Sequence, residues 1–359
     1  MLNKIIQIMI SLMGFINIID LINCYDKSPI LLFPGLGGSR LIKYDKNTNN
    51  KIEIWPPKIN YFLFNYKDWS KNMKINYDDI SDKNIYEQNI KPCEFGNKKS
   101  LDLHTNLPYI IHKNFYDDVI NSYDNIYPIP YDFRLIHIDT YLDDLNNNLS
   151  SYIENFTIPV ILLTHSCGGI VAHNFLHSKD DKWKEKHIKS VINVNVPFGG
   201  LLVTLQESAI NSQYNKIIGK DIIQSLGGII INLPNKDIFN SILKVNGKEI
   251  DDYLNYFNLN HIKKMYEKTF NIRKCFDKSN RIKTEIVYTD NIDTPGSLEI
   301  NDGNINIINT KGDGAVPLFS LLVPKKWNNK NIKFTPINDY THSEIFFSQQ
   351  IKNIINEHL

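Results

Sequence analysis

The stretch Pro159-Val-Ile-Leu-Leu-Thr-His-Ser-Cys-Gly-Gly169 decides the fold of this chain, because it joins an apolar run to a serine among small residues. Residues 160–164 are typical of a buried strand, and the glycines that follow allow a sharp turn into a helix. Such a turn lifts the hydroxyl of Ser166 above the edge of a sheet. We expect glycine at position 168 because a side chain there collides with the preceding strand.

This motif departs from the usual G-x-S-x-G pattern at its first position, where Thr164 replaces glycine. An ordinary strand–helix turn with a capping serine is therefore an alternative interpretation. The distribution of glycine favours the nucleophile, because clusters mark backbone that turns tightly or approaches a ligand closely. Nine of the 17 glycines fall in four clusters, at positions 35, 37, 38, 168, 169, 199, 200, 312 and 314.

Length and composition are those of an ordinary globular protein. The 359 residues suffice for one large α/β domain with insertions or for two small domains. The net charge of +1 provides no basic footprint for nucleic acid. No metal or nucleotide motif of the H-E-x-x-H, C-x-x-C or G-x-x-x-x-G-K-[ST] type occurs, so we expect neither a metal nor a cofactor.

Apolar runs that alternate with helical patterns predict an α/β fold with a mostly parallel central sheet. Helices are expected at 141–156, 169–177 and 343–358, and a hairpin at 298–307 around Asp302-Gly303. Two stretches break the alternation, an aromatic-rich one at about 43–100 and an amphipathic one at 201–282. We expect both to be insertions over the carboxyl edge of the sheet, where such folds bind ligands. The expected strands are 30–33, 125–127, 160–164, 190–194, 283–288 and 332–336.

Residues 1–23 have the features of a secretory signal peptide or an N-terminal anchor. Lys4 precedes a mostly apolar stretch at 5–19, which is closer to the roughly 7–15 residues of a signal core than to the roughly 20 of a spanning helix. We therefore expect a secreted or lumenal protein, as in a vacuole or lysosome, with membrane association left open. In that compartment Cys93 and Cys275 could pair, and two glycosylation sequons, at Asn148 and Asn155, would fit.

Six motifs together resemble the lecithin:cholesterol acyltransferase family, which includes lysosomal phospholipase A and phospholipid:diacylglycerol acyltransferases. They occur in the family's order and span roughly residues 29–345. The resemblance implies an α/β-hydrolase fold with cap or lid insertions and an activity on lipid acyl esters. The motifs are Pro34-Gly-Leu-Gly-Gly-Ser39, Pro130-Tyr-Asp-Phe-Arg-Leu135, His165-Ser-Cys-Gly-Gly169, Pro197-Phe-Gly-Gly200, Gly312-Asp-Gly-Ala-Val-Pro317 and His342.

Acyl transfer of this type needs a nucleophile, a base and an orienting acid, which α/β-hydrolases carry in the order serine, acid, histidine. Ser166 is the expected nucleophile. His342 is the expected base, because it follows the 332–336 strand and precedes a helix. His261 falls in an insertion and His358 lies near the end of the chain, so both are weaker candidates.

The expected acid is Asp313, which lies between two glycines and could project from a tight loop toward the histidine. Asp290 follows a strand and is the main competitor. The resemblance of 312–317 to the family motif favours Asp313, although an ordinary Asp-Gly turn is the plain alternative.

An oxyanion hole in this architecture uses the amide after the nucleophile, here Cys167, and one from the loop after an early strand. The resemblance assigns the second amide to Leu36. Gly35, Gly37 and Gly168 are expected to support the site by keeping its backbone thin. Asp132 and Arg134 are expected to form an internal polar network that supports the site without direct chemistry.

The function favoured by these residues is a serine-dependent lipid O-acyltransferase or phospholipase A. Ser166 would take an acyl chain from a phospholipid and pass it to water, a sterol or diacylglycerol. A soluble carboxylesterase or thioesterase and an inactive lipid-binding protein are the alternatives. We also expect a mobile cover at 201–245, hinged at Gly227-Gly228. Four aromatic residues are expected to dock on a membrane or lipid particle, unless they pack inward as a small satellite core: Trp55, Phe62, Phe64 and Trp69.

Overall fold

The computed structural model describes residues 27–44, 50–76, 89–103, 115–210, 213–274, 282–327 and 330–359. The expected targeting segment at 1–23 and Cys275 lie outside these residues. The nature of the N-terminus and the Cys93–Cys275 pair therefore stay predictions. No helix in the described part of the chain is both long and apolar enough to cross a bilayer.

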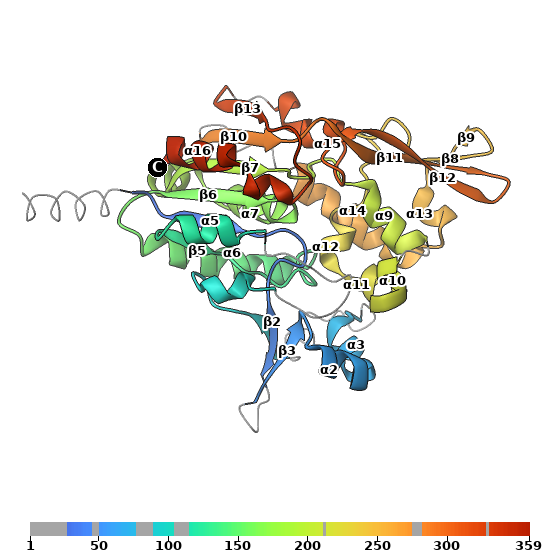
Figure 1. Cartoon of the computed structure of the whole chain (residues 1–359), viewed down its shortest axis with the longest axis horizontal. Helices are drawn as coiled ribbons and strands as arrows, with labels where there is room; N and C mark the ends of the chain where they lie inside the picture. The colour runs from blue at the N-terminus through green and yellow to red at the C-terminus, as the bar shows by residue number, and fades with distance from the viewer. Residues whose placement is uncertain are drawn as a thin grey trace, which may run out of the picture.

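The centre of the molecule is a six-stranded sheet whose neighbouring strands all run parallel (Figure 1). Each of the six expected strands is present, with ends within two residues of the prediction. Strand β6, which leads to Ser166, lies in the middle of the sheet, where both of its edges are paired. The order across the sheet is β13 (Ile332–Pro336), β10 (Lys283–Tyr288), β7 (Ile188–Val194), β6 (Val160–His165), β1 (Ile30–Phe33) and β5 (Ile126–Pro128).

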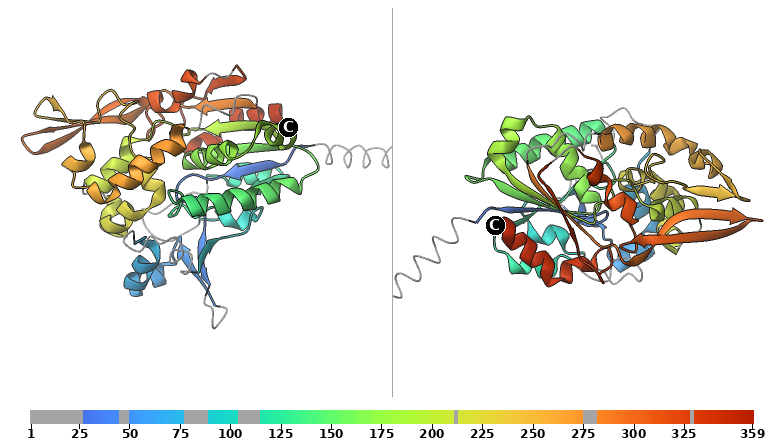
Figure 2. Two further views of the ribbon diagram at one scale, coloured as in Figure 1. Left: turned by 180° about the vertical axis from the view of Figure 1, so that it is seen from behind. Right: turned by 90° about the horizontal axis from the view of Figure 1, so that it is seen from above.

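Helices cover both faces of this sheet (Figure 2). Two clusters of buried hydrophobic side chains fill the spaces between the layers. Alternate residues of β1 serve the two clusters, because successive side chains of a strand point to opposite faces. Leu31 and Phe33 belong to the cluster that includes helices α6 (Asp139–Glu154) and α7 (Cys167–His177). Ile30 and Leu32 belong to the cluster under α5 (Asp117–Ser122) and α16 (Gln349–His358).

The closing helix is shorter than the predicted 343–358. Residues Glu344–Phe347 form a separate 3₁₀ turn, and α16 begins only at Gln349. Ser348 separates the two, and its Oγ accepts a hydrogen bond from the Gln350 N–H at 3.1 Å. A serine side chain that satisfies a backbone amide in this way favours a helix start over a helix interior.

The first insertion forms a small antiparallel sheet and two short helices, drawn in blue in Figure 1. Strand β2 (Leu41–Tyr44) lies between β3 (Lys51–Trp55) and β4 (Ile90–Pro92). The helices α2 (Ile59–Phe64) and α3 (Tyr66–Met73) follow β3 directly.

The second insertion is mainly helical and shares a second sheet with the predicted hairpin. That hairpin is longer than expected, and its strands β11 (Ile292–Asn301) and β12 (Asn304–Gly312) extend away from the central sheet in Figure 2. Strand β8 (Leu243–Val245) pairs with β11 and with β9 (Lys248–Glu249). The helices are α9 (Leu202–Ala209), α10 (Gln213–Ile218), α11 (Lys220–Ser225), α12 (Gly227–Ile230), α13 (Tyr253–Tyr256) and α14 (Asn260–Lys274).

Candidate active site

Ser166 occupies the sharp turn between β6 and α7, with backbone angles of φ 51° and ψ −130°. A non-glycine residue rarely has a positive φ, so the surrounding structure must hold it there. Gly168 permits this turn, because a Cβ at that position would lie 2.5 Å from the carbonyl oxygen of Phe33. The expected collision is therefore real, but it is with the end of β1 and not with β6.

The departure from glycine at position 164 is accommodated by the neighbouring strand. Thr164 is fully buried, and its Oγ1 donates a hydrogen bond to the Asn193 Oδ1 on β7 at 2.9 Å. The threonine side chain therefore lies against the sheet and leaves the turn at Ser166 undisturbed. Thr164 is thus no reason to prefer the plain strand–helix turn.

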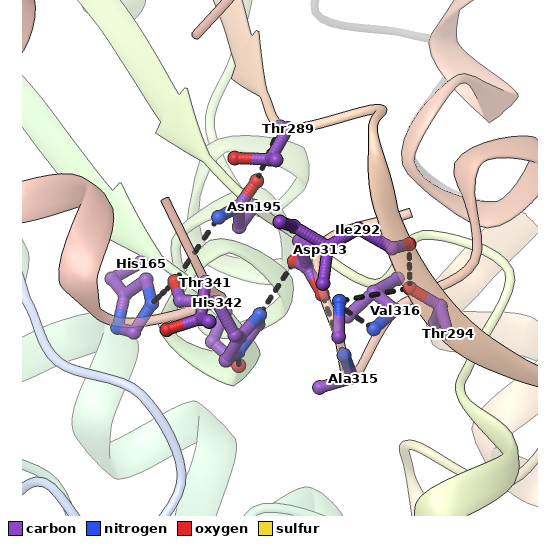
Figure 3. A network of polar contacts seen from close by, with 12 residues as sticks. His165, Asn195, Thr289, Ile292, Thr294, Asp313, Ala315, Val316, Thr341 and His342 are labelled. Atoms are coloured by element: carbon purple, nitrogen blue, oxygen red, sulfur yellow. Dashed lines mark hydrogen bonds and ion pairs between the residues drawn. The ribbon is translucent and has the colours of Figure 1, made fainter. Parts of the chain in front are cut away.

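A continuous chain of hydrogen bonds joins three of the predicted site residues, and Figure 3 shows its Asp313–His342 part. The His342 Nε2 lies 2.8 Å from the Ser166 Oγ, and the His342 Nδ1 lies 2.6 Å from the Asp313 Oδ2. A carboxylate can only accept, so the Nδ1 carries a proton and the Nε2 is left to accept the serine proton. This is the geometry of a nucleophile, a base and an orienting acid.

Asp313 is fully buried. The backbone of its own loop donates hydrogen bonds to the carboxylate oxygen that does not contact His342. The Asp313 Oδ1 accepts hydrogen bonds from the N–H groups of Ala315 and Val316, at 2.9 and 2.6 Å. The alternative interpretation, an Asp-Gly turn, is thus compatible with this role, because the turn fixes the carboxylate that faces His342. The competitor Asp290 follows β10 and is partly exposed.

The other two candidate histidines lie away from Ser166. His261 is on helix α14 of the second insertion. His358 lies in α16, where its Nδ1 is 2.7 Å from the Ser190 Oγ and its Nε2 is 2.9 Å from the Glu285 Oε2. These three side chains resemble a triad in connectivity, but all three residues are buried to 2% exposure or less, so no substrate reaches them.

The loop of residues 34–38, here named the oxyanion loop, is held by side chains from several elements. The Tyr131 hydroxyl donates to the Pro34 carbonyl at 2.7 Å, and the Trp55 Nε1 donates to the Gly37 carbonyl at 2.7 Å. The Gly35 N–H donates to the Tyr116 hydroxyl at 2.8 Å. Among the described residues no hydrogen bond uses the Leu36 N–H.

The second expected oxyanion amide belongs to Cys167, the first residue of α7. The first N–H groups of a helix have no acceptor within the helix, and the helix dipole favours negative charge at that end. The position of Cys167 therefore fits the expected role.

Asp132 and Arg134 form the expected internal network, and both side chains are buried. The Arg134 Nη2 lies 2.6 Å from the Asp132 Oδ2, and its Nε lies 2.9 Å from the Oδ1. Arg134 also donates through Nη1 to the Asn72 carbonyl on α3. The carbonyls of Phe133 and Arg134 in turn accept hydrogen bonds from the second insertion. This network therefore joins the two insertions to the central domain.

The glycine pair Gly227-Gly228, which we expected to act as a hinge, donates the two hydrogen bonds that the carbonyls of Arg134 and Phe133 accept. The Gly227 and Gly228 N–H groups donate at 2.9 and 2.8 Å, and both residues are buried. A Cβ on Gly227 would overlap the His137 ring, and one on Gly228 would overlap Leu36. Gly227 therefore permits close packing against His137, and Gly228 permits it against Leu36 of the oxyanion loop. The hinge at this pair stays a prediction.

An apolar cavity of about 420 Å³ lies beside Ser166. Residues of both insertions contribute to its walls. Its lining is dominated by hydrocarbon side chains, which suits an acyl chain better than a polar substrate. Six of the apolar residues that line it are Met73, Phe133, Leu201, Ile223, Leu226 and Ile229.

The four aromatic residues expected at a lipid surface divide into two groups. Phe62 and Trp69 are buried against each other, with ring centroids 4.7 Å apart, and Trp55 lines the cavity. The expectation is wrong for these three, because their rings complete the core between the insertion and the oxyanion loop. Phe64 is 80% exposed, as expected, and its neighbour Leu63, which our sequence analysis missed, is 62% exposed.

A known protein family matches the part of the chain that contains Ser166. The lecithin:cholesterol acyltransferase family matches residues 112–293, which is half of the chain. The chain belongs to this family. The matched region contains Ser166 and the Asp132–Arg134 pair, but it ends before Asp313 and His342. The family match therefore does not reach the expected acid and base, and the structure places them beside Ser166.

Individual members of the lecithin:cholesterol acyltransferase family are distant. Phosphatidylcholine-sterol acyltransferase of Mus musculus is 26% identical over 204 residues, which cover 50% of this chain and 45% of that protein. Lysosomal phospholipase A and acyltransferase of Homo sapiens is 29% identical over 79 residues, 21% of this chain and 19% of that protein. The chain thus matches less than half the length of these curated relatives.

The similarity of fold to a known structure covers more of the chain than the sequence similarity to the curated relatives does. A chain in the crystal structure of the Tle4–Tli4 complex superposes with a TM-score of 0.60, covering 92% of this chain and 98% of that one, at 11% identity. At that identity the likeness concerns the fold alone. Together with the parallel sheet and the sharp strand–helix turn at Ser166, it identifies this member of the lecithin:cholesterol acyltransferase family as an α/β-hydrolase.

Proposed function

We propose that this protein is a serine-dependent lipid acyltransferase or phospholipase A that acts on phospholipid acyl esters through an acyl-enzyme on Ser166. One observation carries the proposal. The hydrogen-bonded chain from Asp313 through His342 to Ser166 ends at the wall of an apolar cavity. The family membership supports a lipid substrate over other esters.

The geometry supports the following first half-reaction. The Ser166 Oγ attacks the carbonyl carbon of the acyl ester while the His342 Nε2 takes the hydroxyl proton. The carbonyl oxygen becomes an oxyanion, which we assign to the N–H groups of Leu36 and Cys167. When the ester bond breaks, the leaving lysophospholipid oxygen takes the proton from His342, and the acyl chain remains on Ser166.

The second half-reaction transfers the acyl chain to an acceptor. A water molecule or an alcohol gives its proton to the His342 Nε2 and attacks the acyl carbon, and the Ser166 oxygen is reprotonated as it leaves. Buried Asp313 stabilises the imidazolium in both halves. Water gives a phospholipase, whereas a sterol or diacylglycerol gives an acyltransferase.

We assign contact with a membrane or lipid particle to the exposed end of α2, where Leu63 and Phe64 lie. Lys58 and Lys67 flank these two residues in sequence, and both are exposed. Apolar side chains bordered by basic ones suit the headgroup level of a lipid surface. We also propose a secretory location, secreted or lumenal, in keeping with the apolar segment at 5–19.

A fluorophosphonate probe followed by peptide mass spectrometry tests the mechanism. Labelling should occur at Ser166 and should disappear in Ser166→Ala. A folded wild-type protein that is never labelled would instead be an inactive lipid-binding protein. Acyl-labelled phospholipid vesicles, alone or with a sterol or diacylglycerol, then identify the acceptor from the products. Hydrolysis of soluble esters with no activity on any vesicle would indicate a carboxylesterase.

A further inference from the structure

The oxyanion loop and the loop that carries His342 are joined by two buried side chains outside the triad. The Tyr116 hydroxyl, which accepts from the Gly35 N–H at 2.8 Å, also lies 2.7 Å from the His165 Nδ1. The His165 Nε2 lies 3.1 Å from the main-chain carbonyl oxygen of His342. One continuous path therefore runs from Gly35 to His342, passing beside Ser166.

The directions of these hydrogen bonds follow from the chemistry of the groups. A carbonyl oxygen can only accept, so the His165 Nε2 carries a proton and donates a hydrogen bond to the main-chain carbonyl oxygen of His342. A neutral imidazole then has an accepting Nδ1, and the Tyr116 O–H donates to it. Every group in this path is satisfied by one arrangement of protons. Burial, reinforced by the nearby His342, holds the pKa of His165 well below its usual value, which keeps the ring neutral.

Packing holds both rings in place. Tyr116 is 3% exposed and His165 is 3% exposed. Their ring centroids lie 5.6 Å apart, and each packs against Phe346, at 5.2 and 5.0 Å. The His342 carbonyl has a second donor in the Asn195 Nδ2 at 3.0 Å, so the main chain beside the base is fixed from the ends of two neighbouring strands (Figure 3).

We propose that Tyr116 and His165 are positioning residues, which act as one hydrogen-bonded relay to hold the oxyanion loop and His342 at a fixed separation around Ser166. The inference rests on the proposed function, because it concerns how that site is kept in its reactive geometry. By occupying the Gly35 N–H, Tyr116 also leaves the next amide, that of Leu36, to face the substrate. Neither residue exchanges a proton with the substrate.

The relay predicts a loss of turnover without a loss of substrate binding. Tyr116→Phe and His165→Leu should each lower kcat on p-nitrophenyl butyrate between about ten- and a hundredfold at nearly constant KM, because small displacements of reacting groups slow chemistry by such factors. His165→Gln, which can still donate to the His342 carbonyl, should recover part of the loss. The double variant Tyr116→Phe/His165→Leu should be little worse than either single variant, because each breaks the same path.

Two matched controls separate positioning from general destabilisation. Tyr123→Phe removes a buried hydroxyl that bonds to α16 at the opposite end of α5. His173→Leu removes another buried histidine, one that bonds to Asn193. Both controls should lower the melting temperature about as much as the test variants while keeping kcat. A kcat within twofold of wild type in Tyr116→Phe, losses equal to those of the controls, or losses that multiply in the double variant would each overturn the relay.

A second readout does not depend on activity. The proton on the His342 Nδ1 should give a far-downfield resonance in the proton NMR spectrum, assigned by its loss in His342→Gln. It should shift or broaden in Tyr116→Phe and stay unchanged in Tyr123→Phe. An unchanged resonance in Tyr116→Phe counts against the relay. A wild-type protein with no labelling and no esterase activity refutes the proposed function instead, while this resonance still reports on the relay.

Discussion

Phe62 and Phe64 lie two residues apart on helix α2, yet Phe62 is 8% exposed and Phe64 is 80% exposed. Phe62 packs between Tyr66 and Trp69, with ring centroids 5.5 and 4.7 Å away. An exposed aromatic side chain has a cost in water that contact with lipid removes. The candidate docking surface is therefore centred on Leu63 and Phe64, and it excludes the buried rings of Phe62 and Trp69.

The double variant Leu63→Ser/Phe64→Ser tests this surface. It should weaken binding to phosphatidylcholine vesicles in a flotation assay and lower activity on vesicles about tenfold or more. The reason is that two apolar side chains, which would be buried in the lipid on contact, are lost. Activity on p-nitrophenyl butyrate should stay unchanged, since the triad is untouched.

The matched control is Tyr256→Ser, which removes a 42% exposed aromatic residue from the second insertion. It should leave both vesicle binding and vesicle activity at wild-type levels. Equal losses for soluble and vesicle substrates in the double variant would show that Leu63 and Phe64 act through stability and not through lipid contact.

The triad gives a prediction that separates the two candidate acids. Ser166→Ala should abolish labelling and turnover, and Asp313→Asn should lower kcat on p-nitrophenyl butyrate by about a thousandfold or more, because the histidine loses its orienting partner. Asp290→Asn removes the competing carboxylate, which is partly exposed after β10, and should be nearly silent. A severe loss in Asp290→Asn with a mild one in Asp313→Asn would reverse the assignment.

The sheet could be predicted from sequence because it has local signals. The residues of the proposed triad could be named from local signals and, for Asp313, from the resemblance of 312–317 to the family motif. The apolar runs mark strands that are buried on both faces, and glycine marks the turns beside Ser166 and Asp313. His342 could be located because it lies between a strand and a helical pattern. These features depend on short-range spacing, and the structure moves their boundaries by only a few residues, apart from the closing helix and the longer hairpin.

The residues that sequence could not place depend on packing between distant segments. No periodicity relates Tyr116 to His165, because the two meet only after α5 has packed against the sheet. The docking prediction for the aromatic residues at 52–69 was wrong at three positions for a similar reason. Their composition is the same whether they face lipid or core, and the burial of Trp55 depends on its contact with Gly37 on another loop. The position of His165 beside Ser166 indicated that it could matter for the site, but no motif indicated which residues it contacts.

The turn at Ser166 makes a prediction about stability. Gly168→Ala places a methyl group against the Phe33 carbonyl oxygen, a backbone atom that cannot move away. The substitution should lower the free energy of unfolding by about 3 kcal/mol or more and abolish labelling of Ser166. Gly247→Ala is the control, because its φ of +77° brings only backbone strain of about 1–2 kcal/mol and no heavy atom lies within 4 Å. Equal destabilisation by the two, measured by urea unfolding, would show that close approach to β1 does not constrain the turn.

The buried Glu285 predicts how stability depends on acid. Burial alone raises the pKa of this carboxyl group, but hydrogen bonds from His358, Thr335 and Lys333 together outweigh it and lower the pKa to about 2. A carboxylate with a lowered pKa contributes stability that is fully present above its unfolded value of about 4.5. That contribution, on the order of 2 kcal/mol, is lost as the pH falls from there through about 2.

Glu285→Gln should therefore be less stable than wild type at pH 6, and the difference in the free energy of unfolding should shrink between pH 4.5 and pH 3. Urea unfolding at pH 6, 5, 4 and 3 measures this difference. Glu357→Gln is the matched control, since its carboxylate contacts the same Lys333 but is 60% exposed, and solvent screening leaves such pairs little net energy. A difference for Glu285→Gln that stays constant across this range would mean that the carboxylate is not held charged by its buried partners.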